Sequence, residues 1–263
     1  MRYATAIWNY AEPHIPLADL VRDFADLGYD TISFLPWQFV NCEPSAARDV
    51  VALLDERNLA ATVHGNFETP LEDARRVIDL LGERLLAMTF DAAMRPSSLG
   101  TVFDSGRMAG HVQSLLEMTP NASFRLAVED YPLDALALGF HREHLGQLMQ
   151  CGRYGMLVDV GHMNMRLTGG GYFEGQSVMD YFRRLPLPVV EVHLHDNNGV
   201  KDEHGHFGLG NIEFGQVAQA LKAIGFDGVS TIEIAPTFHG SNPAESRPRS
   251  RESLETWKAL WEG

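Results

Sequence analysis

Carboxylate and imidazole side chains recur in this sequence at or just after the ends of short apolar segments. The residues concerned are His64, Asp91, Glu129, Asp159, His162, His193, His195, Asp196 and Glu233. If the apolar segments are parallel strands of one barrel, their carboxyl ends share one face and these side chains converge on one pocket. So many charges would repel one another or stay unpaired unless a cation joined them. Mixed nitrogen and oxygen ligands suit a divalent metal such as Mn, Zn, Co or Fe, and we retain Mg as a further cofactor candidate.

Each of these residues also has a purely structural interpretation. A glutamate at the end of a strand is often a helix cap or an ion-pair partner, Asp159 is suited to cap the next helix, and His193 could be a hydrogen-bonded core histidine. The conjunction favours function, because carboxylates or imidazoles end four consecutive predicted strands. We therefore interpret Glu129, Asp159, His193 and Glu233 as functional residues around one metal.

A long polar and glycine-rich segment, HLHDNNGVKDEHGHFGLG, runs from His193 to Gly210. It could be a flexible exposed loop, but it also supplies an Asp-x-His pair that forms, with His162, a natural second metal site. The residues that we assign to a second metal or to the substrate are His64, Asp91, His162, Asp202 and His204. We assign His195 to the substrate. The segment Thr168–Tyr172 (TGGGY) is either a mobile lid or a loose loop.

The elements that must position these residues alternate along the chain. Short apolar runs predict strands at Tyr3–Trp8, Thr31–Leu35, Ala60–His64, Leu85–Phe90, Arg125–Glu129, Gly155–Asp159, Val189–His193 and Ser230–Ile234. Amphipathic patterns predict helices at Leu17–Leu27, Ser45–Arg57, Leu71–Leu81, Gly110–Met118, Leu136–Met149, Ser177–Phe182, Phe214–Ile224 and Ser250–Trp261. The strands are almost continuously apolar, which a parallel sheet buried on both faces requires.

Eight strand–helix units in one uninterrupted series favour a closed α/β barrel over an open sheet. The length of 263 residues is close to the roughly 250 of one (β/α)8 TIM barrel. No linker or low-complexity tract divides the sequence, so we expect one barrel domain over residues 1–263. No G-x-G-x-x-G follows the first strand and no Walker motif occurs, so we expect no nucleotide cofactor.

Composition narrows the partners. A formal net charge of −14, from 35 acidic and 21 basic residues, argues against nucleic acid as a partner. Of the three lysines, Lys222 and Lys258 fall in predicted helices and Lys201 in a polar loop, which argues against Schiff-base chemistry. The two cysteines form no redox or disulfide framework, and no segment suggests a signal peptide or a membrane span, so a cytoplasmic location is expected. A homo-oligomer is left open.

The most specific motifs are Asp159-Val-Gly-His162, His193-Leu-His-Asp196, Asp202-Glu-His204 and Gly208-Leu-Gly210, followed by the strand of Glu233. Together they resemble the xylose isomerase-like barrel superfamily. This is the sugar isomerase and epimerase group, and it also contains the type IV apurinic endonucleases. The resemblance spans essentially the whole chain and implies a TIM barrel with one metal site that all members share.

By this resemblance, the shared metal would be bound by Glu129, Asp159, His193 and Glu233. His193 is chosen over His195 because the family's histidine ligand stands three residues before an acidic residue, here Asp196. The resemblance also implies that His162 contacts a substrate oxygen, as in the epimerases, or a further metal, as in the endonucleases.

Other positions match only some branches of the family, and two of them depart from its patterns. Asp202 and His204 match the third-metal pair of the endonucleases, although Asp-x-His also occurs in sugar enzymes of the group. The endonucleases carry a histidine after the fourth strand, where this chain has Asp91. The ketose 3-epimerases carry an arginine where this chain has Gly199. A straightforward epimerase assignment therefore does not follow from the motifs alone.

The leading hypothesis is metal-dependent isomerisation or epimerisation of a small sugar, polyol or hydroxy-carbonyl compound through an enediolate. Glu129 and Glu233 would remove and return the proton, and His162 would hold the developing oxyanion. An apolar wall for the substrate is assigned to Trp8, Trp37 and Phe67, which could equally be core residues.

Three other functions remain open on the sequence. The alternatives are a sugar or inosose dehydratase, an endonuclease-like phosphodiesterase on abasic DNA, and a metal-dependent binding barrel. The scarcity of Lys and Arg near the last two strand ends predicts an unphosphorylated carbohydrate-like substrate.

Overall fold

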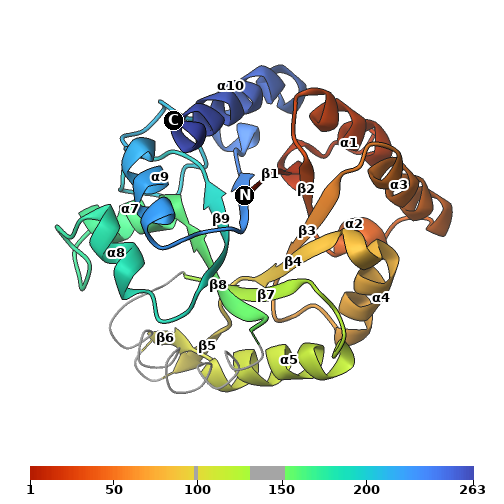
Figure 1. Ribbon diagram of the computed structural model, residues 1–263, viewed down its shortest axis with the longest axis horizontal. Helices are drawn as coiled ribbons and strands as arrows, with labels where there is room; N and C mark the ends of the chain where they lie inside the picture. Colours follow the sequence, from red (N-terminus) through yellow and green to blue (C-terminus); the bar gives the residue numbers. More distant parts are fainter. Residues whose placement is uncertain (98–99, 131–151) are drawn as a thin grey trace.

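A computed structural model describes residues 1–97, 100–130 and 152–263 of the chain. Its centre is a closed barrel of parallel strands in the order β1-β10-β9-β8-β7-β4-β3-β2 (Figure 1). The barrel strands are β1 (Arg2–Ala6), β2 (Thr31–Phe34), β3 (Ala60–Gly65), β4 (Leu85–Phe90), β7 (Arg125–Glu129), β8 (Tyr154–Asp159), β9 (Val189–Leu194) and β10 (Val229–Ile232). The predicted (β/α)8 TIM barrel fold is therefore confirmed, and each predicted strand overlaps one strand of the barrel.

Helices surround the barrel on the outside (Figure 1). They are α1 (Leu17–Asp26), α3 (Pro44–Glu56), α4 (Leu71–Leu81), α5 (Ser105–Met118), α7 (Val160–Thr168), α8 (Val178–Arg184), α9 (Phe214–Ala223) and α10 (Pro243–Glu262), with the short α2 (Trp37–Val40) after β2. The helices are amphipathic because one side of each packs against the barrel. In α1, for example, Leu20, Val21 and Phe24 are the buried residues of that side. The predicted helix Leu136–Met149 lies outside the described residues.

Several elements were not expected from the sequence. The strands β5 (Met94–Ser97) and β6 (Gly100–Phe103) form a separate antiparallel pair after β4, which the sequence analysis did not predict. Helix α7 begins directly after Asp159, and the sequence analysis predicted no helix over this range. Its segment VGHMNMRLT has a weak apolar periodicity, because one side of the helix faces polar groups of the barrel mouth instead of solvent.

The first and last strands close the barrel. Arg2 pairs with Val229 and Thr5 with Ile232, so β1 and β10 lie side by side in the sheet. Helix α10 then packs over this junction, with Trp257 fully buried. It begins seven residues earlier than predicted, at Pro243, and it accommodates Pro248 within its first turns. None of the helices in the described parts of the chain is both long and apolar enough to cross a membrane.

Candidate metal centre

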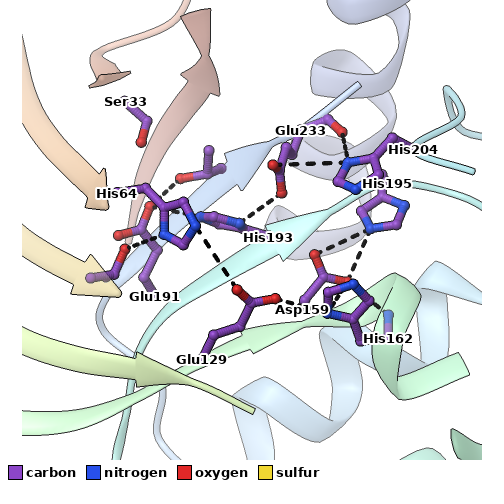
Figure 2. A network of polar contacts seen from close by, with 12 residues as sticks. Ser33, His64, Glu129, Asp159, His162, Glu191, His193, His195, His204 and Glu233 are labelled. Atoms are coloured by element: carbon purple, nitrogen blue, oxygen red, sulfur yellow. Dashed lines mark hydrogen bonds and ion pairs between the residues drawn. The ribbon is translucent and has the colours of Figure 1, made fainter. Parts of the chain in front are cut away.

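The side chains that the sequence analysis grouped around one metal lie at the carboxyl end of the barrel (Figure 2). Glu129 and Asp159 are the last residues of β7 and β8, His193 is the last but one of β9, and Glu233 directly follows β10. The parallel register places Asp159 beside His193. All four side chains are buried, with relative exposures between 1% and 7%.

Asp159, His193 and Glu233 form one fully buried group. Each offers one ligand atom, and these three atoms all lie within 4.8 Å of one another. Nδ1 of His193 is 2.7 Å from Oε2 of Glu233. One imidazole and two carboxylates, all buried and mutually close, are a donor set that suits a divalent transition metal.

Glu129 falls into neighbouring groups that overlap this one. One group contains Glu129, His64 and Asp91, and another contains Glu129, Asp130 and His162. In each group the ligand atoms lie within 4.8 Å of one another. Oε1 of Glu129 is 2.8 Å from Nδ1 of His162, and Oε2 is 3.9 Å from Nε2 of His64. Glu129 thus lies beside the group of Asp159, His193 and Glu233, between the imidazoles of His162 and His64.

A second group gathers around Asp202, as the sequence analysis anticipated for a second metal or a substrate. Oδ2 of Asp202 lies 3.0 Å from Nε2 of His204 and 3.3 Å from Nε2 of His162. His195, Asp202 and His204 each offer one ligand atom, and these three atoms lie within 4.8 Å of one another. His195 and His204 stack with their ring centroids 4.0 Å apart. His195 also reaches the first group, because its Nε2 is 3.0 Å from Oδ1 of Asp159.

Asp159 has the capping role that its sequence position suggested. Its side chain caps α7 by accepting the N–H of His162 at 2.7 Å, and it faces His195 as well. Because the helix starts at once, His162 returns one turn later over the mouth of the barrel. Gly161 lies between these two positions, and an added Cβ there would come within 1.9 Å of the His195 ring. Glycine is therefore required for β8, α7 and His195 to pack together.

Burial and charge act in opposite directions on the acidic ligands. Burial raises the pKa of Glu129, and the nearby imidazoles of His162 and His64 offset only part of that effect. Burial also opposes the charged form of Asp159, but there His162 and His195 prevail and hold its pKa well below the ordinary value. Two carboxyl groups on adjacent strands are thus tuned in opposite directions.

The pair of His193 and Glu233 is strongly coupled. Burial disfavours a charged imidazole, yet the carboxylates of Glu233 and Glu191 together outweigh burial and raise the pKa of His193 well above its ordinary value. In return, and again against the effect of burial, His193 and His204 lower the pKa of Glu233 to about 2. The pKa of His204 is raised to about 9, mainly because Glu233 outweighs its burial.

His64 and Asp91 connect this centre to a cavity of about 500 Å³, which they help to line together with Trp37, Val40 and Asn66. Nε2 of His64 is 3.0 Å from Oδ1 of Asp91. Trp37 is half-exposed at this cavity. The cavity therefore opens beside the group that contains Glu129.

Of the two other aromatic residues assigned to a substrate wall, Trp8 lies beside His64 and His193 at the centre, and Phe67 lies in the core. Trp8 follows the end of β1 and stacks on His64, with ring centroids 5.9 Å apart. Phe67 is buried in the hydrophobic core and contacts the rings of Phe90 and His111. Its position corresponds to the core alternative that the sequence analysis left open.

Two buried carboxyl groups near the centre were missed from the sequence. Asp130 follows Glu129; it accepts the Tyr181 hydroxyl and the N–H of Asp159, and burial raises its pKa to about 7. Glu191 is fully buried in β9, two residues before His193. The signal for Glu191 was the strand period of two, which places residues 191 and 193 on the same face of β9.

An eight-stranded parallel barrel with buried carboxylates and imidazoles at the carboxyl ends of its strands defines the class of molecule. The particular family follows from the sequence profile that matches residues 21–260: the chain belongs to the xylose isomerase-like TIM barrel family. The superfamily resemblance seen in the motifs is therefore confirmed.

Known proteins similar to this chain include 3-epimerases. Fructoselysine 3-epimerase of Shigella flexneri is 21% identical over 97% of each chain. The structure of D-psicose 3-epimerase with D-tagatose from Clostridium cellulolyticum H10 covers 99% of each chain with a TM-score of 0.70 and 15% identity. The IolI protein with a bound zinc atom covers 99% of this chain and 96% of its own, with a TM-score of 0.65 and 14% identity. The chain is thus a sugar epimerase-like TIM barrel with distant 3-epimerase homologues.

Proposed function

We propose that this protein is a divalent-metal-dependent epimerase or isomerase of a small, unphosphorylated sugar or related hydroxy-carbonyl compound. The observation that carries the proposal is the buried group of Asp159, His193 and Glu233, with Glu129 beside it. The similarity to fructoselysine 3-epimerase over 97% of both chains supports this reaction class. It also favours epimerisation over the alternatives of dehydration and phosphodiester cleavage.

The metal would be held by Asp159, His193 and Glu233, with Glu129 as the fourth ligand assigned from the sequence. Their mixed oxygen and nitrogen donors fit Mn, Zn or Co better than Mg, which prefers oxygen ligands. Zinc in the similar IolI structure supports this donor preference. When bound, such an ion polarises a substrate carbonyl and stabilises the charge of an enediolate.

We assign the proton transfer to the two glutamates. Glu129 comes from β7 and Glu233 from the end of β10, and Figure 2 shows them on different sides of His193. One carboxylate would take the proton from the carbon next to the carbonyl, and the other would return a proton to the opposite face, which inverts the configuration. His162 contacts Oε1 of Glu129 and would donate a hydrogen bond to the substrate oxygen.

The cavity beside Glu129 supports the class of substrate. Its volume of about 500 Å³ suits a small molecule, and among the described residues that line it there is no Lys or Arg to bind a phosphate. Asn66 and Asp91 offer hydrogen bonds to hydroxyl groups, and Trp37 offers an apolar face to a sugar ring or chain.

The proposal is tested by proton exchange in the Mn²⁺-loaded protein. A panel of ketoses and inososes is incubated in D₂O, and deuterium at the carbon next to the carbonyl is followed by NMR. We expect exchange with at least one ketose, and a loss of about 100-fold or more in Glu129→Gln. The control Glu117→Gln alters an exposed glutamate of α5 and should retain full activity. Exchange that is unchanged in Glu129→Gln would exclude this role for Glu129.

A phosphodiesterase acting on abasic DNA is the second candidate, because the group of His195, Asp202 and His204 offers a further metal site. Metal analysis and a cleavage assay separate the two functions. Three zinc ions per chain and cleavage of an abasic duplex would favour the nuclease, whereas one metal and no cleavage would count against it. Loss of water from an inosose would instead identify a dehydratase.

A further inference from the structure

A carboxyl group lies inside the barrel directly beneath the metal-binding group. Glu191 belongs to β9, its side chain is fully buried, and it points the same way as His193 (Figure 2). Interiors of TIM barrels are usually filled by branched apolar side chains. A buried carboxyl group instead carries a large desolvation cost unless its surroundings satisfy it. Its presence here therefore calls for a specific set of partners.

Hydroxyl groups from three other strands supply part of that set. Oε1 of Glu191 accepts a hydrogen bond from the Thr231 hydroxyl at 2.5 Å, and the Thr62 hydroxyl lies 3.1 Å away. Ser33 extends the chain, because its Oγ is 2.7 Å from the Thr62 hydroxyl. All of these side chains are fully buried. The arrangement holds the Glu191 carboxyl at one position and in one orientation.

The remaining contact of Glu191 is with His193. Nε2 of His193 faces Oε1 of Glu191 at 3.6 Å, while Nδ1 of the same ring is 2.7 Å from Glu233 on the metal-binding side. Among the described residues, neither Nε2 of His193 nor Oε2 of Glu191 has a hydrogen-bond partner. The 3.6 Å separation is longer than a formed hydrogen bond of up to about 3.2 Å. Nε2 of His193 thus has no competing partner among the described residues, whereas the oxygen that it faces, Oε1, also accepts the Thr231 hydroxyl. Oε2 of the same carboxyl has none.

We propose that Glu191 is a positioning residue for the metal centre. Its carboxyl, anchored by Thr231 and Thr62, accepts the Nε2 hydrogen of His193 and thereby presents Nδ1 to a cation beside Asp159. The physical reason is that the hydrogen bond of one ring nitrogen fixes which nitrogen is free to bind metal. This inference rests on the metal site of the proposed function, but it does not depend on which substrate or reaction that site serves.

The test measures binding of Co²⁺ alone, without any sugar, in Glu191→Leu, Glu191→Gln and Thr231→Val. Partners of this kind typically contribute about 10- to 100-fold in metal affinity, so we expect a loss in that range for Glu191→Leu. Glu191→Gln keeps an oxygen acceptor and should restore most of the affinity. Thr231→Val removes one anchor and should weaken binding by less than Glu191→Leu does.

A matched control separates positioning from general destabilisation. Thr5→Val also removes a buried hydroxyl from a barrel strand, but Thr5 has no hydrogen bond to Glu191, so Co²⁺ affinity should be unchanged. A spectroscopic readout adds a second criterion. In the Zn²⁺-loaded protein with ¹⁵N-labelled histidine, the His193 signal should show hydrogen on Nε2, and this pattern should weaken in Thr231→Val.

The outcomes are distinct from those of the proposed function. Co²⁺ affinity within about twofold of the original in both Glu191→Leu and Glu191→Gln would overturn the inference while leaving the metal site intact. Equal losses in Thr5→Val and Glu191→Leu would overturn it too. If Glu191→Leu does not fold, the comparison of Glu191→Gln with Thr231→Val and the ¹⁵N signal decide. Failure of the chain to bind any divalent ion would remove the proposed metal site and this inference together, whereas lack of epimerase activity would leave both standing.

Discussion

The carboxylate of Asp159 shows how much one residue contributes at this site. It accepts the N–H of His162 in the first turn of α7, contacts the His195 ring and offers an oxygen to the group with His193 and Glu233. These contacts stabilise the negative charge of the Asp159 carboxylate, and a bound cation needs the same negative charge. At the scale of single residues, the folding of the barrel mouth and the binding of metal therefore use the same side chains, and protons compete with the metal for them.

Metal affinity should consequently depend steeply on pH. The pKa of His193 is raised well above its ordinary value because Glu233 and Glu191 together outweigh burial, so the metal must displace a proton at neutral pH. We expect the apparent affinity for Co²⁺ or Mn²⁺ to rise with pH by about tenfold per unit between pH 6 and 8, as expected for one proton released. Titration calorimetry in buffers of different ionisation enthalpy measures the affinity and the number of protons released. Affinity that is flat over this range would contradict the expectation.

The contribution of Asp130 to the stability of the fold should fall as pH rises. Burial raises its folded-state pKa to about 7, above the unfolded value, so it stabilises the fold below about pH 4 and loses this effect as pH rises through 7. Asp130→Asn mimics the protonated form and should increase Tm relative to the original chain progressively from pH 4 to 8, measured in EDTA. The control Asp227→Asn, at an exposed residue paired with Arg125, should show no such trend. A constant difference would argue against titration of Asp130.

At the scale of elements, the direct passage from β8 into α7 arranges the second group. The helix begins without a connecting loop, and its first turn brings His162 towards Glu129 and Asp202. The turn is possible because Gly161 leaves room for the His195 ring, which is fully buried. Two strands and one helix thus share a single contact point beneath the metal centre.

Gly161→Ala should therefore be harmful out of proportion to its size. The new methyl group would come within 1.9 Å of the His195 ring, so the ring or the helix must move. We expect a loss of about 1–3 kcal/mol in the free energy of unfolding, as for an overpacked core, measured by urea denaturation. Gly110→Ala on α5 is the matched control. Its added Cβ meets no atom within 4 Å, so the helix should become more stable by up to about 1 kcal/mol. Equal effects of the two changes would contradict this account.

At the scale of the whole molecule, the net charge of −14 sets the electrostatic field around the barrel mouth. Such a field attracts divalent cations and disfavours phosphate groups and nucleic acid. The cavity beside His64 reinforces this preference, because its described lining includes Glu68 and Asp73. Charge and cavity therefore point to the same neutral, hydroxyl-rich substrates.

We expect a free sugar to be preferred over its phosphate ester. The preference in kcat/KM should be about tenfold or more, which corresponds to about 1.4 kcal/mol. Competition between a ketose and its phosphate in the deuterium-exchange assay measures this preference. It should shrink as ionic strength rises, because salt screens the repulsion. Tighter binding of the phosphate ester would refute the prediction.

Much of the fold was predictable from local patterns. Continuous apolar runs mark strands buried on both faces, and every barrel strand was placed to within a few residues in this way. Helix α7 was missed because its residues follow contacts at the barrel mouth instead of a regular apolar period. The short β5–β6 pair was missed as well. Glu191 was also missed, since a single carboxylate within an apolar strand carries no sign of the Thr62 and Thr231 hydroxyls that surround it.

The sequence by itself determined the series of strands and helices, and the kinds of ligand that stand at the strand ends. Both depend on local periodicity, which any one segment carries. Only the tertiary structure decided which ligands meet. Closure of the barrel and the register of β8 with β9 bring Asp159 beside His193, and pairing of β9 with β10 brings Glu233 to the same point. Glu129 is directed towards His162, and His195 towards Asp202. Distances between side chains on different strands arise from closure and register, which no segment encodes alone.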